Sequence, residues 1–479
     1  MESSREKALL NNTLIITIGT VCTKLVTFFL LPLYTGILST EEYGILDLLN
    51  VLVALLLPIV TFQVEQAVFR ELINARENEK NIREIISNGV FSVILQCICF
   101  GVLFIIIFPI IKNEYKIYLA INVMTSIFSS LALQISRGLG ENRKYSIGSF
   151  ISASFTIIFN VIFLVVLKMR VRGLLLGTMI GQVVCIMYLF VSLRLSSYIS
   201  VKLIEDKIIK KLWKYSIPLI PNAISWWVFG SSDRVIVTVF LGLPMNGILS
   251  AASKFSAMYI TIYNIFNMSW TESIALHIDD KDANKYFSKV FNLIMKIFIS
   301  FAVVLISTMP VLYPMMINNR YSYGYTVVPI LILGSLFNVV VGLISVIYVG
   351  KKNTRAIANT SIISAILNIV IHIVLIKFIG LYAAAVSTLA SYFIMAVYRY
   401  CDINKKYFKI ELDLNMIGNS IVAIIIVIIA YYINNIYWNI FSTIFATIFA
   451  IYINKDIIKK MYSIMKNKIK RKTITKVNN

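Results

Sequence analysis

Residues Ile85–Ile111 read IISNGVFSVILQCICFGVLFIIIFPII and contain no charged side chain. About 20 consecutive apolar residues are enough for a helix to cross the hydrocarbon core of a bilayer. Runs of this kind recur along the chain from Asn11 to Asn454. Hydrophobic residues make up 58% of the 479 residues and charged residues 14%, whereas soluble domains carry about 25% charged residues. The sequence therefore predicts an all-α polytopic membrane protein and excludes a soluble globular one.

Apolar windows along the chain predict about fourteen transmembrane helices. The intervals between them are too short to fold as separate soluble domains. The connection at Gly242–Pro244 is the least secure, because Asp233 and Arg234 could instead mark a loop. The predicted spans are Asn11–Gly36, Ile45–Phe69, Ile85–Ile111, Tyr118–Ile135, Ser146–Leu167, Gly173–Leu193, Tyr215–Leu241, Met245–Trp270, Val290–Ile317, Tyr325–Val349, Ala356–Ile376, Gly380–Tyr398, Met416–Ile433 and Ile436–Asn454.

The basic residues orient these helices. With both termini in the cytoplasm, the cytoplasmic segments hold 34 Lys and Arg and the outer loops hold 7, while the other 4 of the 45 lie within spans. Such an excess is what the positive-inside rule requires. We therefore expect both termini inside, Lys80 inside, and Glu42, Asn318 and Asn435 outside. The basic tail, residues 456–479, is expected to contact anionic lipid head groups and no nucleic acid.

Two short segments indicate an internal repeat. In both Leu38–Leu46 and Leu241–Leu249, a Gly-Ile-Leu tripeptide begins six positions after a leucine. Each segment joins an outgoing span to an incoming one. Transporters are often built from duplicated bundles with the substrate site between them. The predicted organisation is a six-helix lobe in residues 1–200, a second six-helix lobe in 201–410 and a central cavity between them. Two further helices follow in 411–455.

Several charged side chains fall inside the predicted spans. A charge at the bilayer centre costs at least ~2.5 kcal/mol, so it normally faces a partner or a water-filled cavity. The alternatives are a cavity lining and structural ion pairs. We assign three cations to a substrate cavity: Lys24, Arg234 and Lys254. We assign three acids to possible ion coupling: Asp47, Glu65 and Asp233. Two further arginines, Arg70 and Arg137, lie near the cytoplasmic mouth of the cavity or anchor the protein at the membrane interface.

The seventh predicted span begins with the most distinctive stretch. Residues Tyr215–Trp227 read YSIPLIPNAISWW, with two prolines three positions apart. Each proline removes a backbone donor, so the helix is predicted to break near the cytoplasmic mouth. Asn222, Trp226 and Trp227 are candidate saccharide contacts, although ordinary helix packing explains the two rings equally well.

These landmarks together resemble the polysaccharide-exporter flippase family, within the superfamily that also holds multidrug-and-toxin extruders and the lipid II flippase. The resemblance rests on their order and spacing over nearly the whole chain. The segments that carry it are Gly19–Lys24, Leu31–Thr35, Glu42–Asp47, Glu65–Arg70, Ser136–Gly140, Tyr215–Trp227 and Ser232–Arg234.

The resemblance implies a flippase in the bacterial inner membrane that works by alternating access. Its substrate would be an oligosaccharide repeat unit linked to undecaprenyl diphosphate, destined for O-antigen of lipopolysaccharide, capsule or exopolysaccharide. Lys24, Arg234 and Lys254 suit a diphosphate, since guanidinium and ammonium groups bind phosphate oxygens well. The implied partners are this lipid-linked substrate, membrane lipids, a polysaccharide polymerase and chain-length proteins. We expect no cofactor, no metal site and no catalytic residue.

Two other functions remain open on the sequence alone. A cation-coupled multidrug extruder would share the fold, but an acidic cavity would suit its cargo better than these basic residues do. A multi-span glycosyltransferase or polymerase is the alternative from another class, and Glu41 and Glu42 could then form a metal-binding pair. The first outer loop is short, however, and no large outer loop could hold a second substrate.

Overall fold

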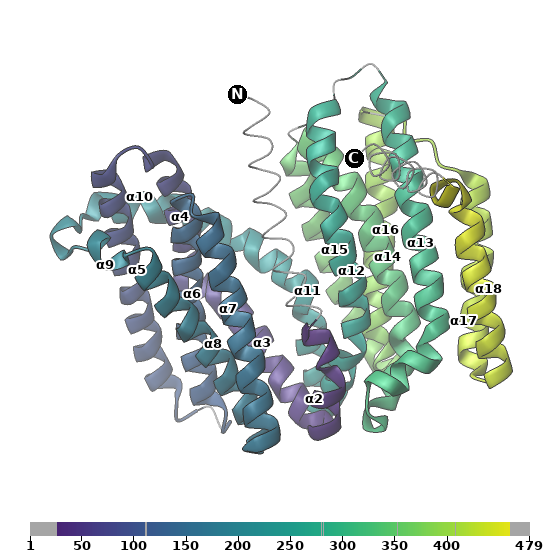
Figure 1. Ribbon diagram of the computed structural model, residues 1–479, viewed down its shortest axis with the longest axis horizontal. Coiled ribbons are helices and arrows are strands. Elements are labelled where there is room, and N and C mark those ends of the chain that lie inside the picture. The colour runs from purple at the N-terminus through teal and green to yellow at the C-terminus, as the bar shows by residue number, and fades with distance from the viewer. Residues whose placement is uncertain are drawn as a thin grey trace, which may run out of the picture. The chain divides into compact units, whose positions relative to one another are not determined.

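The computed structural model describes residues 26–110, 113–278, 280, 282–351, 353–407 and 409–459. This part is helical and contains no strand (Figure 1). Eleven of the described helices are long and apolar enough to cross a membrane. Two more long helices, α12 (Leu243–His277) and α16 (Tyr382–Lys406), lie at predicted spans, and the first predicted span is described from Val26 onward. The all-α polytopic fold is confirmed.

The surface of helix α5 (Glu79–Ile107) explains why these helices need a bilayer. Val102, Ile105 and Ile106 are each more than half exposed. A soluble protein would place polar side chains at such positions, because a large exposed apolar patch is costly in water. In a membrane the same side chains face lipid, while the helix satisfies its own backbone hydrogen bonds. The protein is therefore a multi-pass membrane protein.

The described residues form two compact units, and the first comprises the chain up to Lys254 together with Asn368–Ala384. In this unit α7 packs along α8, and buried side chains such as Val68, Ile127 and Leu189 form its core. Its elements are α2 (Leu31–Ile37), α3 (Thr40–Thr61), α4 (Val64–Ala75), α5, α6 (Lys116–Gly138), α7 (Asn142–Val161), the π-helical turn η1 (Ile162–Val166), α8 (Arg170–Ser192), α9 (Leu195–Tyr198), η2 (Val201–Leu203), α10 (Asp206–Ser216), η3 (Ile217–Leu219), α11 (Ile220–Leu241) and the first turns of α12.

The second unit comprises Phe255–Leu367 and the chain from Ala385 onward. Helix α13 packs against α14, α17 and α18. The boundary at Lys254 differs from the predicted boundary at residue 200, and the division into two six-helix lobes stays a prediction. The elements are the rest of α12, α13 (Ala283–Met316), η4 (Asn319–Val327), α14 (Val328–Gly350), most of α15 (Thr354–Ile379), most of α16, α17 (Leu414–Ile433) and α18 (Ile436–Ile453).

The second predicted span, Ile45–Phe69, is not one continuous helix, so that prediction was wrong. Helix α3 ends at Thr61 and α4 begins at Val64, while Phe62 and Gln63 adopt left-handed backbone angles with φ of 49° and 59°. The Thr61 hydroxyl donates to the Leu57 carbonyl oxygen at 2.9 Å and accepts from the Gln63 N–H at 3.1 Å. This side chain therefore replaces the backbone partners that would have continued the helix.

The seventh predicted span breaks where its prolines predict. Helix α10 stops at Ser216, a short 3-10 turn covers Ile217–Leu219, and α11 runs from Ile220 to Leu241. Pro218 and Pro221 lie in the first turns of η3 and α11, where a missing N–H removes no helical hydrogen bond. The turn that follows lies at Gly242, with φ of +89°. Asp233 and Arg234 are thus inside α11 and mark no loop.

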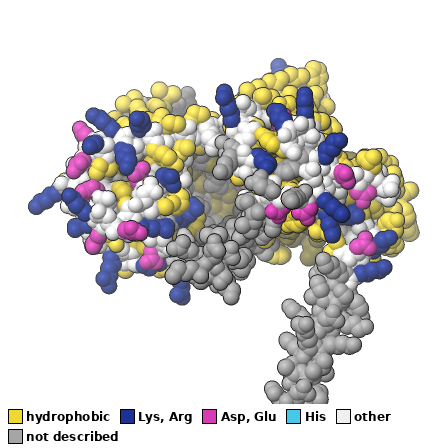
Figure 2. All heavy atoms as spheres, turned by 90° about the horizontal axis from the view of Figure 1, so that it is seen from above, with side chains coloured by type: hydrophobic (Ala, Val, Ile, Leu, Met, Phe, Trp, Pro, Cys, Tyr) yellow, Lys and Arg dark blue, Asp and Glu magenta, His cyan; other side chains and the backbone are white. Residues whose placement is uncertain are grey.

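Basic side chains gather at one end of the first unit. In Figure 1, helices α4, α9 and α10 lie at the upper end of the first unit, and Figure 2, which looks down on that end, shows many Lys and Arg side chains there. This is the end that the basic residues predict to be cytoplasmic.

Candidate functional site

Asp47 and Arg234 form an ion pair inside the first unit. Asp47 lies on α3 and Arg234 on α11, and Arg234 Nε is 3.5 Å from Asp47 Oδ2. Their side chains are only 15% and 17% exposed, respectively. Ser250 donates to Asp47 Oδ1 at 2.6 Å, and Arg234 Nη1 donates to the Ser253 hydroxyl at 3.1 Å. Three helices, α3, α11 and α12, therefore meet in one polar cluster.

A close contact between glycines brings α3 and α12 together. A Cβ atom on Gly44 would lie 2.0 Å from the Leu243 carbonyl oxygen, and one on Gly247 would lie 1.9 Å from the Thr40 carbonyl oxygen. Each glycine therefore faces the residue four positions before the other, and the contact is reciprocal. Small residues let membrane helices approach this closely. The Asn246 amide closes the contact by donating to the Gly44 carbonyl oxygen at 2.9 Å.

This contact joins the two segments in which Gly-Ile-Leu recurs. About one turn beyond Gly44 lies Asp47; about one turn beyond Gly247 lies Ser250, and nearly two turns beyond it lies Ser253. Glycine at both positions thus sets the distance at which the side chains of the cluster can meet. The recurrence in the sequence pointed to these positions, although it did not predict that the two segments touch.

Lys254 adds a second cation to the cluster. It lies on α12, is half-buried, and interacts electrostatically with both Asp47 and Arg234. Within the described ranges, Lys254 forms no ion pair. The cluster therefore brings together two basic side chains and one acidic side chain, Asp47. Lys24, the third predicted cavity cation, lies outside the described residues.

Asp233 has a different partner from its neighbour Arg234. Its Oδ1 lies 2.9 Å from Nδ1 of His372, which comes from α15 and is fully buried. Nε2 of His372 has no hydrogen-bond partner in the described part of the chain. His372 is therefore a residue of this cluster of charges that sequence reasoning missed. An isolated histidine in an apolar helix gives no signal of a partner 139 residues away.

Glu65 lies apart from this cluster, just after the break between α3 and α4. Its side chain is 1% exposed, and Oε2 has no hydrogen-bond partner among the residues that the structure describes. A buried carboxyl oxygen that lacks a hydrogen-bond partner is costly. The three predicted acids occupy three environments: Asp47 pairs with an arginine, Asp233 with a histidine, and Glu65 is enclosed.

The predicted saccharide contacts differ from one another. Trp227 donates its ring N–H to the Val51 carbonyl oxygen at 2.8 Å, so this indole fixes α11 to α3. Trp226 is 63% exposed and Asn222 is exposed, which leaves both side chains accessible on the surface of the unit. Ser225 bonds back to the Pro221 carbonyl oxygen at 2.7 Å, so it satisfies the first turn of α11.

The two arginines predicted near the cytoplasmic mouth lie at the basic end of the first unit. Arg70 is exposed on α4. The Arg137 guanidinium lies 4.6 Å from the centre of the Phe69 ring and 5.5 Å from that of Tyr145. Cation–π contacts of this kind hold Arg137 in place. Arg137 thus has a packing role, and its part in substrate entry stays a prediction.

A fully buried arginine in the second unit escaped the sequence analysis. Arg399 lies one residue beyond the predicted span Gly380–Tyr398, but the structure places it within α16, where it is 2% exposed. Its guanidinium donates to Thr360 at 2.9 Å and to Ser361 at 3.0 Å on α15, and also to Ser345 on α14. A cage of neutral oxygen atoms therefore holds this charge and ties three helices together.

Comparison with solved structures identifies the class of fold. The inward-closed structure of the lipid II flippase MurJ matches with a TM-score of 0.67 and 17% identity, covering 93% of this chain and 100% of that one. An inward-facing MATE family multidrug transporter of the MOP superfamily matches at 0.64 with 10% identity, over 80% and 98% of the two chains. Its outward-facing counterpart matches at 0.57 with 10% identity, over 84% and 95%. The chain has the fold of MOP superfamily transporters.

The family follows from the sequence itself. Residues 9–271 match the model of the polysaccharide biosynthesis protein family. The chain belongs to this family, as its resemblance to the polysaccharide exporters implied. No curated protein matches the sequence significantly.

Proposed function

We propose that the protein is a flippase that carries oligosaccharide repeat units linked to undecaprenyl diphosphate across the bacterial inner membrane by alternating access. The exported units would serve the synthesis of a surface polysaccharide such as O-antigen or capsule. The observation that carries the proposal is the cluster of Asp47, Arg234 and Lys254, which places two basic side chains beside one acid within apolar helices. Membership of the polysaccharide biosynthesis protein family supports the choice of cargo.

The diphosphate is assigned to Lys24, Arg234 and Lys254. Arg234 already holds one carboxylate, so a diphosphate would compete with Asp47 for the guanidinium, and Lys254 offers a charge without an anionic partner. Phosphate oxygens form short, charge-assisted hydrogen bonds with both groups. The polyprenyl tail can remain in lipid, and the saccharide can contact Asn222 and Trp226.

A multidrug extruder is the second candidate, because MATE transporters share the fold. A cluster with two basic side chains and one acidic side chain suits an anionic head group better than a cationic drug. Cells that lack the protein but keep the enzymes of repeat-unit synthesis should accumulate lipid-linked saccharide on the cytoplasmic leaflet. Expression of the protein should clear it and restore surface polymer. Unchanged leaflet distribution and polymer, together with altered drug efflux, would favour the extruder.

A further inference from the structure

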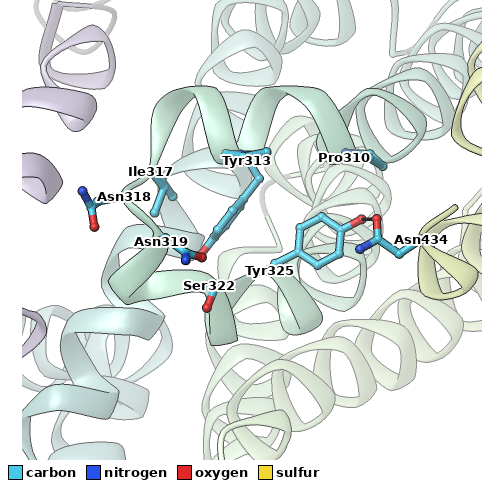
Figure 3. A pocket seen from close by; sticks show the side chains of 9 residues that line it. Pro310, Tyr313, Ile317, Asn318, Asn319, Ser322, Tyr325 and Asn434 are labelled. Atoms are coloured by element: carbon cyan, nitrogen blue, oxygen red, sulfur yellow. Dashed lines mark hydrogen bonds between the residues drawn. The ribbon is translucent and has the colours of Figure 1, made fainter. Parts of the chain in front are cut away.

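The second unit contains a pocket of about 320 Å³ at one end of its helix bundle (Figure 3). The end of α13 and the turn η4 form most of its wall, and the residue that ends α17 completes it. Small-molecule sites occupy roughly 300–1,000 Å³, so the size suits a small ligand. The lining residues are Pro310, Tyr313, Pro314, Ile317, Asn318, Asn319, Ser322, Tyr325 and Asn434.

All nine lining residues are uncharged, and the polar ones are amides and hydroxyls. Asn319 and Ser322 are exposed, and their side chains make no hydrogen bond with any other described residue. A carboxamide and a hydroxyl each offer both a donor and an acceptor. The Asn319 amide and the Ser322 hydroxyl therefore suit a ligand whose neighbouring groups both donate and accept hydrogen bonds.

The aromatic wall of the pocket is fixed before any ligand arrives. The Tyr325 ring stacks on Tyr431 at 4.2 Å between centroids and 11° between planes, and it meets Tyr313 edge to face at 5.6 Å. Tyr313 donates its hydroxyl to the Tyr321 carbonyl oxygen at 2.8 Å. Figure 3 shows the Tyr313 and Tyr325 rings side by side in the wall. A wall held in this way loses little freedom on binding.

Asn434 brings the C-terminal helices into the pocket. It lies between α17 and α18 with a left-handed φ of 48°, a conformation that asparagine tolerates better than most residues. Its Oδ1 accepts a hydrogen bond from the Tyr325 hydroxyl at 3.5 Å. Figure 3 shows the two side chains facing each other. This long contact leaves the amide available to a ligand.

We propose that this pocket binds a neutral sugar ring of the exported saccharide. Vicinal hydroxyls of a sugar fit the amides and Ser322, and its C–H face fits an aromatic wall. A diphosphate would find no cation among the lining residues, and a purely apolar ligand would leave the Asn319 amide and the Ser322 hydroxyl without partners at a cost. The statement that this sugar belongs to the exported saccharide rests on the proposed function. The predicted orientation places Asn318 and Asn435 outside, so the pocket would receive sugar that has crossed the membrane.

Saturation-transfer-difference NMR on the full-length protein in detergent tests the binding, with methyl glycosides of glucose, galactose, N-acetylglucosamine and rhamnose as probes. We expect transfer to at least one of them. Asn319→Ala should weaken it about fivefold, as expected for the loss of one hydrogen bond. Asn434→Gly keeps the left-handed backbone and removes only the amide, so it should weaken glycoside binding by a similar factor. Tyr323→Phe, on the same turn but outside the pocket, is the control and should change nothing.

Transfer to none of the four glycosides, or equal transfer in the parent and both pocket variants, overturns the proposal. A second arm measures surface polymer in cells. Weaker glycoside binding in Asn319→Ala with an unchanged rate of export would overturn the assignment to the exported saccharide. If the parent binds glycosides but moves no lipid-linked saccharide in vesicles, the proposed function fails while the sugar site stands.

Discussion

Gly44 and Gly247 occupy equivalent positions in a reciprocal contact, in which each leaves no room for a side chain beside the other's helix. The contact sets the spacing of α3 and α12, and with it the position of Asp47 relative to Ser250 and Lys254. Asn246 adds the hydrogen bond that closes it. The recurring Gly-Ile-Leu segments therefore have a physical role: they allow two helices to touch next to a group of charges.

Gly44→Ala and Gly247→Ala should both lower the thermal stability of the purified protein, because the new methyl group would meet a backbone carbonyl oxygen within about 2 Å. Gly230→Ala on α11 is the matched control, since nothing lies within 4 Å of its would-be Cβ. In a helix interior, replacing glycine with alanine leaves the free energy of unfolding unchanged or raises it by up to about 1 kcal/mol. Equal melting temperatures for Gly44→Ala and Gly230→Ala would contradict the close contact.

The pairing of Asp47 with Arg234 gives a direct test of the diphosphate assignment. Arg234→Ala should abolish surface polymer at a normal level of inserted protein, and Arg234→Lys should recover only part of it, because an ammonium lacks the planar fork. If the pair were only structural, removing both charges in Asp47→Ala with Arg234→Ala should restore export. We expect no restoration, and recovered polymer in the double variant would refute the assignment.

Coupling, if a cation gradient drives export, is expected to involve the contact between Asp233 and His372. Asp233→Asn and His372→Gln disturb the same 2.9 Å contact, so both should reduce the response of export to collapse of the proton or sodium gradient. Glu41→Gln, at an exposed position on α3, is the control. An unchanged response in both variants, measured as export with and without an ionophore, would exclude this pair from coupling.

The start of α17 should depend on pH. Asp413 caps this helix by accepting from the Met416 N–H at 3.0 Å, and Lys296 lies 3.4 Å away. The Met416 N–H, with help from Lys296, holds the pKa of the Asp413 carboxyl below its usual range. Its stabilisation is therefore complete above the unfolded pKa of about 3.9 and is lost as the pH falls through the lower folded value.

Asp413→Ala should lower the free energy of unfolding by about 1 kcal/mol at neutral pH, which is the usual effect of losing a helix N-cap. Asp413→Asn keeps the capping oxygen and loses only the charge, so it should cost less. The difference in melting temperature between the parent and Asp413→Asn should be full above about pH 4 and should shrink progressively as the pH falls further. A difference that persists unchanged at lower pH would rule out the charge as its cause.

Much of this fold could be read from the apolar runs and the prolines. Pro218 and Pro221 remove donors, so the break before α11 was predictable. The break between α3 and α4 was not, because Phe62 and Gln63 are residues that seldom adopt left-handed angles. Neither is a glycine or an asparagine, and only the double role of the Thr61 hydroxyl accounts for it.

The candidate site could be predicted only in part. A charge in an apolar run stands out, so Asp47, Arg234 and Lys254 could be found one by one. Their partners could not, because Ser250, Ser253 and His372 are common residues whose role depends on which helices pack together. The pocket beside Tyr325 could not be predicted for the same reason. Its amides and hydroxyls lie at helix ends, and they form a pocket only because η4 packs against the turn between α17 and α18.

The central claim is that Arg234 and Lys254 hold the head group of a lipid-linked saccharide during its transfer. The most direct measurement follows undecaprenyl-diphosphate-linked saccharide from the inner to the outer leaflet of vesicles that contain the purified protein, with an impermeant probe of the sugar. The parent should move it, and Arg234→Ala and Lys254→Ala should each slow the transfer by about ten- to a hundredfold, as expected for a lost charge-assisted hydrogen bond. Lys296→Ala, which removes a cation paired with Asp413, should transfer at the parental rate. No transfer by the parent, or parental rates in both cluster variants, would contradict the account.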